Sequence, residues 1–540
     1  MGDPRLRYER INIGPFTRSN MDDIPEYNKD NMMWSRDIIF NDLGWPTSRP
    51  GYDNVTTSTH ANFPSSGLTR GWMYNPSGTY IGMVTDGKKF YYNTTGAPFV
   101  AMTTEHDPTW GNAVHVTAVK FNNVMYFSPH YDATGYEGYS FDGSSWTALT
   151  ELSAAGGSGY YRARTSAVVH ERIFVANIYE TTTHYPYRIR WSNPDTATTW
   201  TDTDYIDLPP DDGGEIMAIV PYQNSILIFR EEAVYVLTGR SSDSFTIYKL
   251  TDEYGSHSEQ QIVKKNDKIY FYHYREGLVM FDGESFEKQT FSNGQTISIA
   301  YSSREEVTVA KFADAYDAGN FIIVTKDGFA YSYCLNVSNG LMSKWWREWG
   351  FSIEGIGSYK DNLYLVDAPF SDEADLKRVW RLDASRLDDG ANIMNRIQTD
   401  FIRSESGQPF RVISLEFDIH LDWQDGGNVD NHYCDIDAYL DGTFDNYDTR
   451  SIAISAFDSN FSDNWHRVYV PFEFGESTNQ HNPGGRGRGV NSIMFMWKVD
   501  TTPPGSRNVD LFGIANIVLT IEVMDEVKQR EVISMEYKVI

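Results

Sequence analysis

The stretch YSFDGSSWTALT, from Tyr139 to Thr150, returns as a near-copy, VMFDGESFEKQT, from Val279 to Thr290. Both copies read F-D-G-x-S-aromatic-x-x-x-T in the same register, 140 residues apart. Asp-Gly pairs supply the positive φ angles that tight turns between antiparallel strands need. The repeated phrase therefore predicts a hairpin in which Asp-Gly turns one strand into the next, and the aromatic residue packs between neighbouring sheets.

A longer unit surrounds this phrase and recurs along the chain. A short polar turn followed by an apolar strand occurs seven times, as in KFNNVMYFS and KKNDKIYFYH. The first apolar residues of these strands are separated by steps of 44, 49, 53, 43, 52 and 42 residues, and they are Tyr80, Val124, Ile173, Ile226, Ile269, Phe321 and Leu363. Seven units at this regular spacing indicate a repeat architecture.

Each unit reads as four short strands. The fourth carries an aromatic residue: Trp146, Trp200, Phe245, Phe286, or the tryptophans at 345, 346 and 349. Four antiparallel strands in about 40 to 50 residues, repeated, are typical of a β-propeller. One four-stranded sheet cannot bury both of its faces, so each blade packs on the next and the ring closes. The sequence predicts about seven blades, although six or eight remain compatible because a chain end can complete the closing blade. We assign blade turns and blade packing to Asp142, Gly143, Trp146, Asp282, Gly283, Phe286, Trp191 and Trp200.

Two segments lie outside the repeat, so we divide the chain into three parts. Residues 1–68 show no repeat, and we expect an extended N-terminal arm that runs over a surface. Residues 69–396 form the propeller. Residues 397–540 contain longer alternating strands, such as FRVISLEFDIHLDW and FGIANIVLTIEV, which predict a β-sandwich resembling a jelly roll.

The composition is strongly acidic. The chain has 46 Lys and Arg against 74 Asp and Glu, a formal net charge of −28. Such a charge favours solubility and disfavours tight binding to DNA or to anionic lipid. Cys334 and Cys434 lie in different regions and predict two buried thiols. We find no apolar run that predicts a signal peptide or a membrane segment, so we expect a protein made in a cytoplasm and not exported by a standard route.

The motifs of common enzymes are absent from the sequence. SNPDTATTW (Ser192–Trp200) has the Ser, Asp and Trp of a sialidase Asp-box, but it lacks the glycine and has the wrong spacing. The Asp residues of the Asp-Gly pairs are better explained as turn formers than as paired catalytic acids. We therefore expect no enzymatic activity, no catalytic residues and no cofactor.

Three further clusters have a structural and a functional interpretation. DNHYCDIDAYLDGTFDNYD gathers acids that could bind a hard cation, including Asp430, Asp435, Asp437, Asp441 and Asp445. Alternation places Asp435 and Asp437 on one solvated strand face, and we expect no metal. The loop NPGGRGRGVN could contact phosphate or another subunit through Arg486 and Arg488. The tryptophans at 345, 346 and 349 could stack a sugar ring, but packing between blades is the simpler expectation.

The sequence resembles the β-propeller tail hub or nozzle proteins of short-tailed bacteriophages. The resemblance covers most of the chain and rests on architectural motifs. SRPGYDNV (Ser48–Val55), after a long extended arm, looks like the start of the first blade in that group. The strongest match runs from Tyr187 to Gly239, YRIRWSNPDTATTWTDTDYIDLPPDDGGEIMAIVPYQNSILIFREEAVYVLTG. A sandwich after the last blade is also usual in the group.

The resemblance implies a structural virion protein, assembled in the host cytoplasm and placed in the tail. Such nozzle proteins assemble as rings, usually homohexamers, below a head–tail adaptor, and offer surfaces to fibres or spikes. Viral DNA passes through the ring during ejection without specific binding. An acidic or neutral lumen would repel phosphates, whereas basic walls would hold them.

Two alternatives follow from the propeller fold itself, because a fold does not fix a function. One is a carbohydrate- or receptor-binding propeller, also compatible with a tail, whose affinity would depend on exposed aromatic residues. The other, less favoured, is a propeller glycosidase, which needs two carboxylates converging on the ring face at about 5–10 Å.

Overall fold

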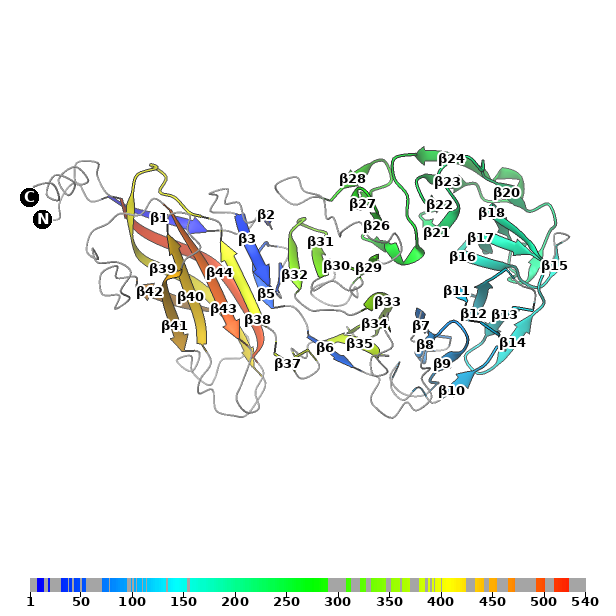
Figure 1. Ribbon diagram of the computed structural model, residues 1–540, viewed down its shortest axis with the longest axis horizontal. Helices are drawn as coiled ribbons and strands as arrows, with labels where there is room; N and C mark the ends of the chain where they lie inside the picture. Colours follow the sequence, from blue (N-terminus) through cyan, green and yellow to red (C-terminus); the bar gives the residue numbers. More distant parts are fainter. Residues whose placement is uncertain are drawn as a thin grey trace, which may run out of the picture.

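The computed structural model describes residues 70–289, with gaps at 77, 95–98, 100–101, 103, 109, 113, 133–134 and 153–155. Outside that span it describes ranges 7–13, 18–19, 31–36, 38–40, 43–48, 51–54, 307–311, 321–326, 332–345, 351–359, 362–369, 378–383, 387–388, 391–392, 394–399, 401–423, 433–440, 446–453, 465–471, 492–500 and 509–523. The fold is all-β, with a ring of small sheets beside a sandwich of long strands (Figure 1).

Within the described residues, six four-stranded antiparallel sheets and one six-stranded sheet form the ring, which confirms the β-propeller. Blade 1 consists of β7 (Arg70–Tyr74), β8 (Ile81–Thr85), β9 (Phe90–Tyr92) and β10 (Thr104–His106). Blade 2 consists of β11 (His115–Phe121), β12 (Val124–His130), β13 (Gly138–Phe141) and β14 (Trp146–Leu149). Blade 3 consists of β16 (Arg162–Val169), β17 (Arg172–Glu180), β18 (Thr183–Trp191) and β20 (Tyr205–Asp207).

The remaining blades repeat the same meander. Blade 4 consists of β21 (Ile216–Tyr222), β22 (Ser225–Arg230), β23 (Val234–Thr238) and β24 (Thr246–Thr251). Blade 5 consists of β25 (Ile262–Lys265), β26 (Lys268–His273), β27 (Gly277–Phe281) and β28 (Phe286–Lys288). Blade 6 consists of β29 (Val307–Lys311), β30 (Phe321–Lys326), β31 (Ser332–Asn336) and β32 (Met342–Trp345). Each recurring turn-plus-strand of the sequence leads into the second strand of a blade.

Blade 7 is closed by a strand from the N-terminal segment. Its first three strands are β33 (Phe351–Tyr359), β34 (Asn362–Pro369) and β35 (Arg378–Asp383). The fourth is β6 (Gly51–Asn54), which pairs antiparallel with β35 and is followed in the sheet by β36 (Leu387–Asp388) and β37 (Ala391–Asn392). SRPGYDNV therefore supplies the closing strand of blade 7, where we had expected the start of blade 1.

Within the residues that the structure describes, the sandwich has two six-stranded sheets. One contains β1 (Arg7–Ile13), β4 (Ile38–Phe40), β5 (Pro46–Ser48), β39 (Phe410–Trp423), β42 (Trp465–Pro471) and β44 (Val509–Val523). The other contains β2 (Arg18–Ser19), β3 (Asn31–Arg36), β38 (Met394–Thr399), β40 (Tyr433–Leu440), β41 (Asn446–Ala453) and β43 (Ile493–Asp500). Buried apolar side chains from both sheets form one core, including Ile11, Phe417, Ile436, Trp497 and Leu519.

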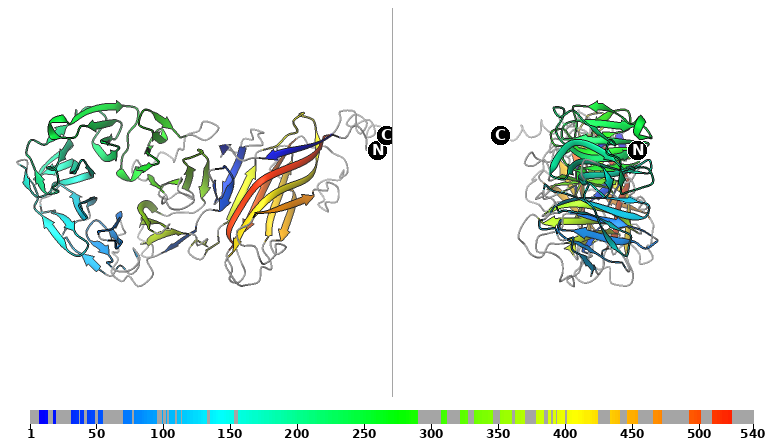
Figure 2. Two further views of the ribbon diagram at one scale, coloured as in Figure 1. Left: turned by 180° about the vertical axis from the view of Figure 1, so that it is seen from behind. Right: turned by 90° about the vertical axis from the view of Figure 1, so that its right-hand side faces the viewer.

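The N-terminal segment, expected as an arm outside both domains, is extended but lies in their sheets. Ile11 and Ile13 of β1 alternate toward the sandwich core, and all of β1 pairs with β44. Because β1 to β5 precede the propeller and β38 to β44 follow it, the propeller is inserted within the sandwich. The two lie side by side, with the sandwich against the rim of the ring (Figure 2). Asn336 of blade 6 donates through Nδ2 to the Phe40 carbonyl at 2.9 Å across this junction.

Candidate functional site

The first strands of the blades lie toward the propeller axis (Figure 1). Many neighbouring first strands contact one another there: β11 contacts β16, β16 contacts β21, β25 contacts β29, β29 contacts β33, and β33 contacts β7. In a four-stranded meander, the start of the first strand and the turn between the second and third strands lie at the same edge of the sheet. In a ring of such blades, these edges together form one face, which we call the axial face. The polar residues described next belong to it.

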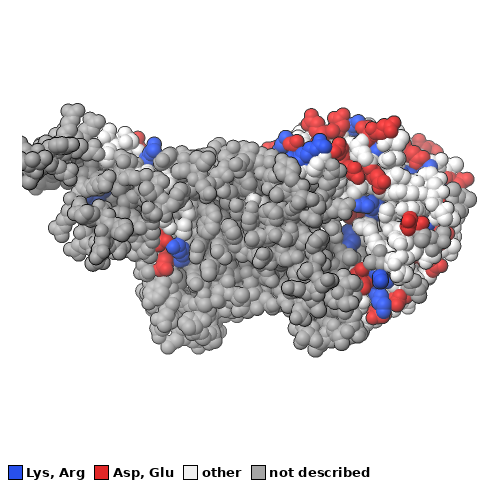
Figure 3. Space-filling model, viewed as in Figure 1, with Lys and Arg blue, Asp and Glu red and all other residues white. Residues whose placement is uncertain are grey.

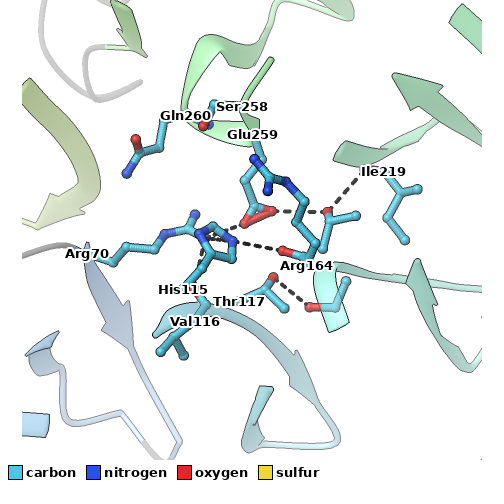
Figure 4. A network of polar contacts seen from close by, with 11 residues as sticks. Arg70, His115, Val116, Thr117, Arg164, Ile219, Ser258, Glu259 and Gln260 are labelled. Carbon is cyan, nitrogen blue, oxygen red and sulfur yellow. Dashed lines mark hydrogen bonds and ion pairs between the residues drawn. The ribbon is translucent and has the colours of Figure 1, made fainter. Parts of the chain in front are cut away.

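An ion pair crosses the axis between distant blades (Figure 4). Arg70, the first residue of β7, pairs through Nη1 with the carboxylate of Glu259, which lies in the short 3₁₀ helix η2 (Glu259–Gln261) before blade 5. The same guanidinium nitrogen donates to the Val116 carbonyl at 2.9 Å, and Glu259 Oε2 accepts from Thr165 Oγ1 at 3.1 Å. Thr165 Oγ1 in turn accepts from the Ile219 amide at 3.1 Å. We call Arg70, Glu259 and Thr165 the axial hub, because these contacts connect blades 1, 2, 3, 4 and the start of blade 5.

His115 lies beside the axial hub in its neutral form. Its Nε2 is 2.9 Å from the Arg164 carbonyl, an acceptor, so Nε2 carries the proton and donates. Burial, with added repulsion from Arg70 and Arg164, lowers the pKa of His115 to about 3. The ring therefore adds no charge between the two arginines at neutral pH. Next to His115, the hydroxyl groups of Thr117 in blade 2 and Ser166 in blade 3 form a hydrogen bond of 3.0 Å.

A second polar cluster surrounds Asn177 in β17. His130 and His184 each direct Nε2 at Asn177 Oδ1, at 3.2 Å and 2.6 Å. Asn177 Nδ2 donates to Glu215 Oε2 at 3.1 Å and to the Ile216 carbonyl at 3.0 Å. Three blades meet here, since His130 ends β12, Asn177 and His184 belong to blade 3, and Glu215 precedes β21. We call these four residues the histidine cluster.

A buried ion network fixes the outer strand of blade 3. Glu180 Oε1 accepts from Arg188 Nη1 at 3.0 Å and from Arg190 Nε at 2.7 Å. Arg188 also makes a bidentate contact with Asp207 of β20, both distances being 2.7 Å, and its guanidinium carbon lies 3.9 Å from the centre of the Tyr205 ring. Bidentate pairs of this kind combine strength with geometric specificity. The arginines of the sequence YRIRW thus hold β20 onto β18.

The two Asp-Gly pairs lie in the turns between the third and fourth strands of blades 2 and 5. Asp142 Oδ1 accepts from the Ser144 and Ser145 amides at 2.8 Å and 2.7 Å, and these bonds lower the pKa of its carboxyl. Asp282 Oδ1 accepts from the Glu284 and Ser285 amides at 2.9 Å and 2.8 Å, with the same effect on its pKa. Gly143 has φ +101° and Gly283 has φ +106°, a region that favours glycine. Both aspartates act locally in these turns.

The aromatic residues singled out in the sequence contact neighbouring side chains. Trp146 lies in the fourth strand of blade 2 and stacks on His106 with ring centres 4.2 Å apart. Phe286 stacks on Phe281 at 4.6 Å. Trp191 is buried and donates through Nε1 to Ser242 Oγ at 3.0 Å. Trp200 is buried too, but it lies in β19 (Thr199–Trp200), paired with β15 (Gly157–Ser158), and not in the fourth strand that we expected to carry it.

Other candidates from the sequence have different outcomes. Arg486 and Arg488 lie outside the described residues. Asp437 is buried at 1% exposure and pairs with Lys498, which corrects the expectation of a solvated acidic face. Cys334 and Cys434 are buried free thiols. Among the described residues, no cluster of three or more His, Cys, Asp or Glu could hold a metal ion. No helix within the described ranges is long and apolar enough to span a membrane.

The sequence did not identify the axial hub or the histidine cluster. Their residues come from different blades, some at strand starts or ends and others, such as Thr165 and Asn177, within strands, and they share no motif. A usable signal was the repeat itself, because it predicts which residues begin the first strand of each blade.

Comparison with known proteins gives likeness in structure only. No family model matches the sequence, and no curated protein matches it. One similar solved structure is YCF48 bound to D1 peptide, with a TM-score of 0.37 and 9% identity over 65% of this chain and 97% of that chain. Another is BBS1N in complex with ARL6DN, soaked with lead, with a TM-score of 0.39 and 11% identity over 62% of this chain and 98% of that chain.

Proposed function

We propose that the chain is a structural subunit of a bacteriophage tail, in the nozzle or hub ring through which DNA leaves the virion. The observation that carries this proposal is the double closure made by the N-terminal segment. Its strand β1 pairs with β44 in the sandwich, and its strand β6 completes blade 7. One continuous segment therefore fastens both domains, an arrangement suited to a load-bearing component.

The closed axis of the propeller supports a conduit formed between copies of the chain. Duplex DNA is about 20 Å across, whereas Arg70 and Glu259 meet directly across the axis. DNA passing through this propeller would have to break the axial hub and separate the blades. The lumen would instead lie between sandwich domains of neighbouring subunits, with the propellers outside as surfaces for the fibres or spikes and the head–tail adaptor bound at the ring.

The charge of the chain supports passage without retention. The charge of the lumen is inferred from the formal net charge of the whole chain, which is −28. The propeller, which lies outside the proposed lumen, carries Asp and Glu along its upper rim with fewer Lys and Arg among them (Figure 3). Phosphates are repelled by such surfaces and bound by basic ones with salt-dependent affinity. The resemblance of Tyr187–Gly239 to tail proteins falls on blades 3 and 4, where the arginines and tryptophans have packing roles.

The proposal implies no turnover and an oligomer of about six copies. Multi-angle light scattering on the purified chain should give a mass of about 370 kDa, six times the 61.7 kDa of one chain. Because a ring can require its adaptor, the measurement is repeated with the adaptor-bearing portal complex of the same virus. A chain that stays monomeric in both samples contradicts the proposal.

A further inference from the structure

Asn177 has a left-handed backbone conformation inside a β-strand. It lies in the interior of β17 with φ +53°, at a β-bulge between Ala176 and Ile178, and it is fully buried. A non-glycine residue in this region is held there by its surroundings, and such positions concentrate at functional sites. The side chain of Asn177 makes four polar contacts that keep it in place, all within the histidine cluster and the adjacent Ile216 carbonyl.

These contacts fix the orientation of the amide and the protons of both histidines. Asn177 Nδ2 faces Glu215 Oε2 and the Ile216 carbonyl, and both of these only accept hydrogen bonds. Asn177 Oδ1 therefore faces the two imidazoles and accepts from both. His130 and His184 must each carry a proton on Nε2.

Both imidazoles are neutral at physiological pH, so their Nδ1 atoms are acceptors. Burial, with repulsion from His115, Arg164 and His184, lowers the pKa of His130 to about 3. Burial and Arg164 also lower the pKa of His184, although Glu215 opposes this. Each side chain is partly exposed, and within the described residues neither Nδ1 has a hydrogen-bond partner. The two rings lie 5.6 Å apart.

We propose that the histidine cluster binds a carbohydrate, two of whose hydroxyl groups donate to Nδ1 of His130 and Nδ1 of His184. Anions are disfavoured because the unprotonated Nδ1 atoms of both histidines would present their lone pairs to the negative charge. Cations are disfavoured by Arg164, whose charge acts on both rings, and no three metal-ligating side chains gather here among the described residues. Neutral donors remain, and a sugar offers several hydroxyl donors to two acceptors on imidazole rings whose centres are 5.6 Å apart. This site does not depend on the proposed tail function.

The cluster is pre-organised for such a ligand. His184 stacks on Tyr179 with ring centres 4.5 Å apart and planes at 15°, and His130 packs against the same tyrosine at 5.1 Å. One tyrosine thus supports both imidazoles. With Nε2 of each ring held by Asn177, little side-chain freedom is lost when a ligand binds.

Isothermal titration of the full chain with glucose, galactose, mannose, rhamnose and N-acetylglucosamine, and with oligosaccharides of each, tests the site. We expect at least one to bind, and His184→Phe, which keeps a ring on Tyr179, to weaken binding about tenfold or more. His130→Phe should have a similar effect. His170→Phe is the matched control, because His170 lies in a turn at the opposite face, where Nε2 contacts the Asn224 carbonyl at 2.8 Å.

Two further measurements use the unsubstituted chain. A bound saccharide should protect His130 and His184, but not His170, from diethylpyrocarbonate, as read by peptide mass spectrometry. The affinity should be the same at pH 8 and pH 7, and any loss on acidification should have its midpoint below the ordinary histidine pKa of about 6.5, because burial lowers the pKa of both imidazoles. The proposal is overturned if no saccharide binds, if binding survives both phenylalanine variants, if binding fades with a midpoint near pH 6.5, or if ZnCl₂ binds the two histidines in place of a sugar.

Discussion

Arg70 and Glu259 are 189 residues apart in the chain and form an ion pair across the axis of the propeller. Their side chains are 10% and 16% exposed, so the pair is largely withdrawn from water. Breaking such a pair by removing one partner is costly, because the remaining charge stays buried. The axial hub therefore contributes to ring closure together with the β6–β35 pairing.

Replacing one partner of the axial hub should destabilise the propeller. For Glu259→Gln we expect a loss of about 3 kcal/mol in the free energy of unfolding, measured by urea denaturation. The double variant Arg70→Met with Glu259→Met should lose less than either single change, because no buried charge is left. Glu232→Gln, whose partner Arg275 is 60% exposed, is the control and should change stability by less than about 1 kcal/mol. Equal effects at both positions would contradict a buried cross-axis pair.

Two glycines with similar backbone angles should differ in their tolerance of a methyl group. Gly143→Ala would place Cβ 2.7 Å from Pro76 Cγ at φ +101°, whereas Gly78→Ala at φ +91° would meet nothing within 4 Å. Both changes cost about 1–2 kcal/mol of backbone strain. Only Gly143→Ala adds a clash between blades 1 and 2, so its melting temperature should fall further. Identical melting temperatures of the two variants would contradict a close contact between Gly143 and Pro76.

The stability of the propeller should decline as pH falls below about 6.5. His115 and His130 have folded-state pKa values lowered to about 3 and His273 to about 4, in each case mainly by burial. A depressed histidine pKa means that the unfolded chain binds more protons below pH 6.5, so acid favours unfolding. Each histidine contributes up to about 1.4 kcal/mol per pH unit until its folded pKa is reached.

Urea denaturation at pH 7, 6, 5 and 4.5 tests this pH dependence. His273→Gln should make the decline shallower, because one of the histidines with a lowered pKa no longer titrates, although His106 and His184, whose pKa values are also lowered by burial, keep part of the slope. Asp142 and Asp282 also have lowered pKa values, but their contribution is lost only at lower pH, below the ordinary value of an aspartate. Stability that is flat from pH 7 to pH 4.5 would contradict neutral buried imidazoles.

The closing strand predicts where a propeller fragment must begin. A fragment of residues 69–396 lacks β6, so blade 7 keeps an exposed edge at β35. A fragment of residues 49–396 contains β6 and should resist limited proteolysis at least tenfold longer, because edge pairing completes the ring. Equal half-lives would mean that β6 does not close blade 7.

The fold could be predicted from the sequence wherever its causes are local. Every blade needs the same hairpin turns and must bury its faces against its neighbours. The turn-plus-strand unit therefore recurs seven times, and the Asp-Gly turn occurs at both Asp142 and Asp282. The strand that closes the ring could not be predicted, because Gly51 pairs with Asp383 and β6 resembles no other unit. The sandwich strands of the N-terminal segment were missed for the same reason, since Arg7 finds its partner at Val523.

The candidate site was less accessible to sequence reasoning than the fold. Glu259 comes from the link before blade 5, while Arg70, His115 and Thr165 come from the first strands of three other blades. Their proximity results from the curvature of the ring, which single-sequence spacing does not encode. Arg188 and Arg190 belong to a motif that the sequence analysis identified, but only the structure shows that Glu180 forms ion pairs with both.

Electron microscopy of the purified chain, alone and on its adaptor complex, tests the proposed tail function most directly. Class averages should contain closed rings of about six copies around an open hole, with the propellers projecting from the outside. The hole should lie between subunits, and each propeller should be closed at its own axis. Solitary particles of one propeller and one sandwich in both samples, with no ring, would contradict the account.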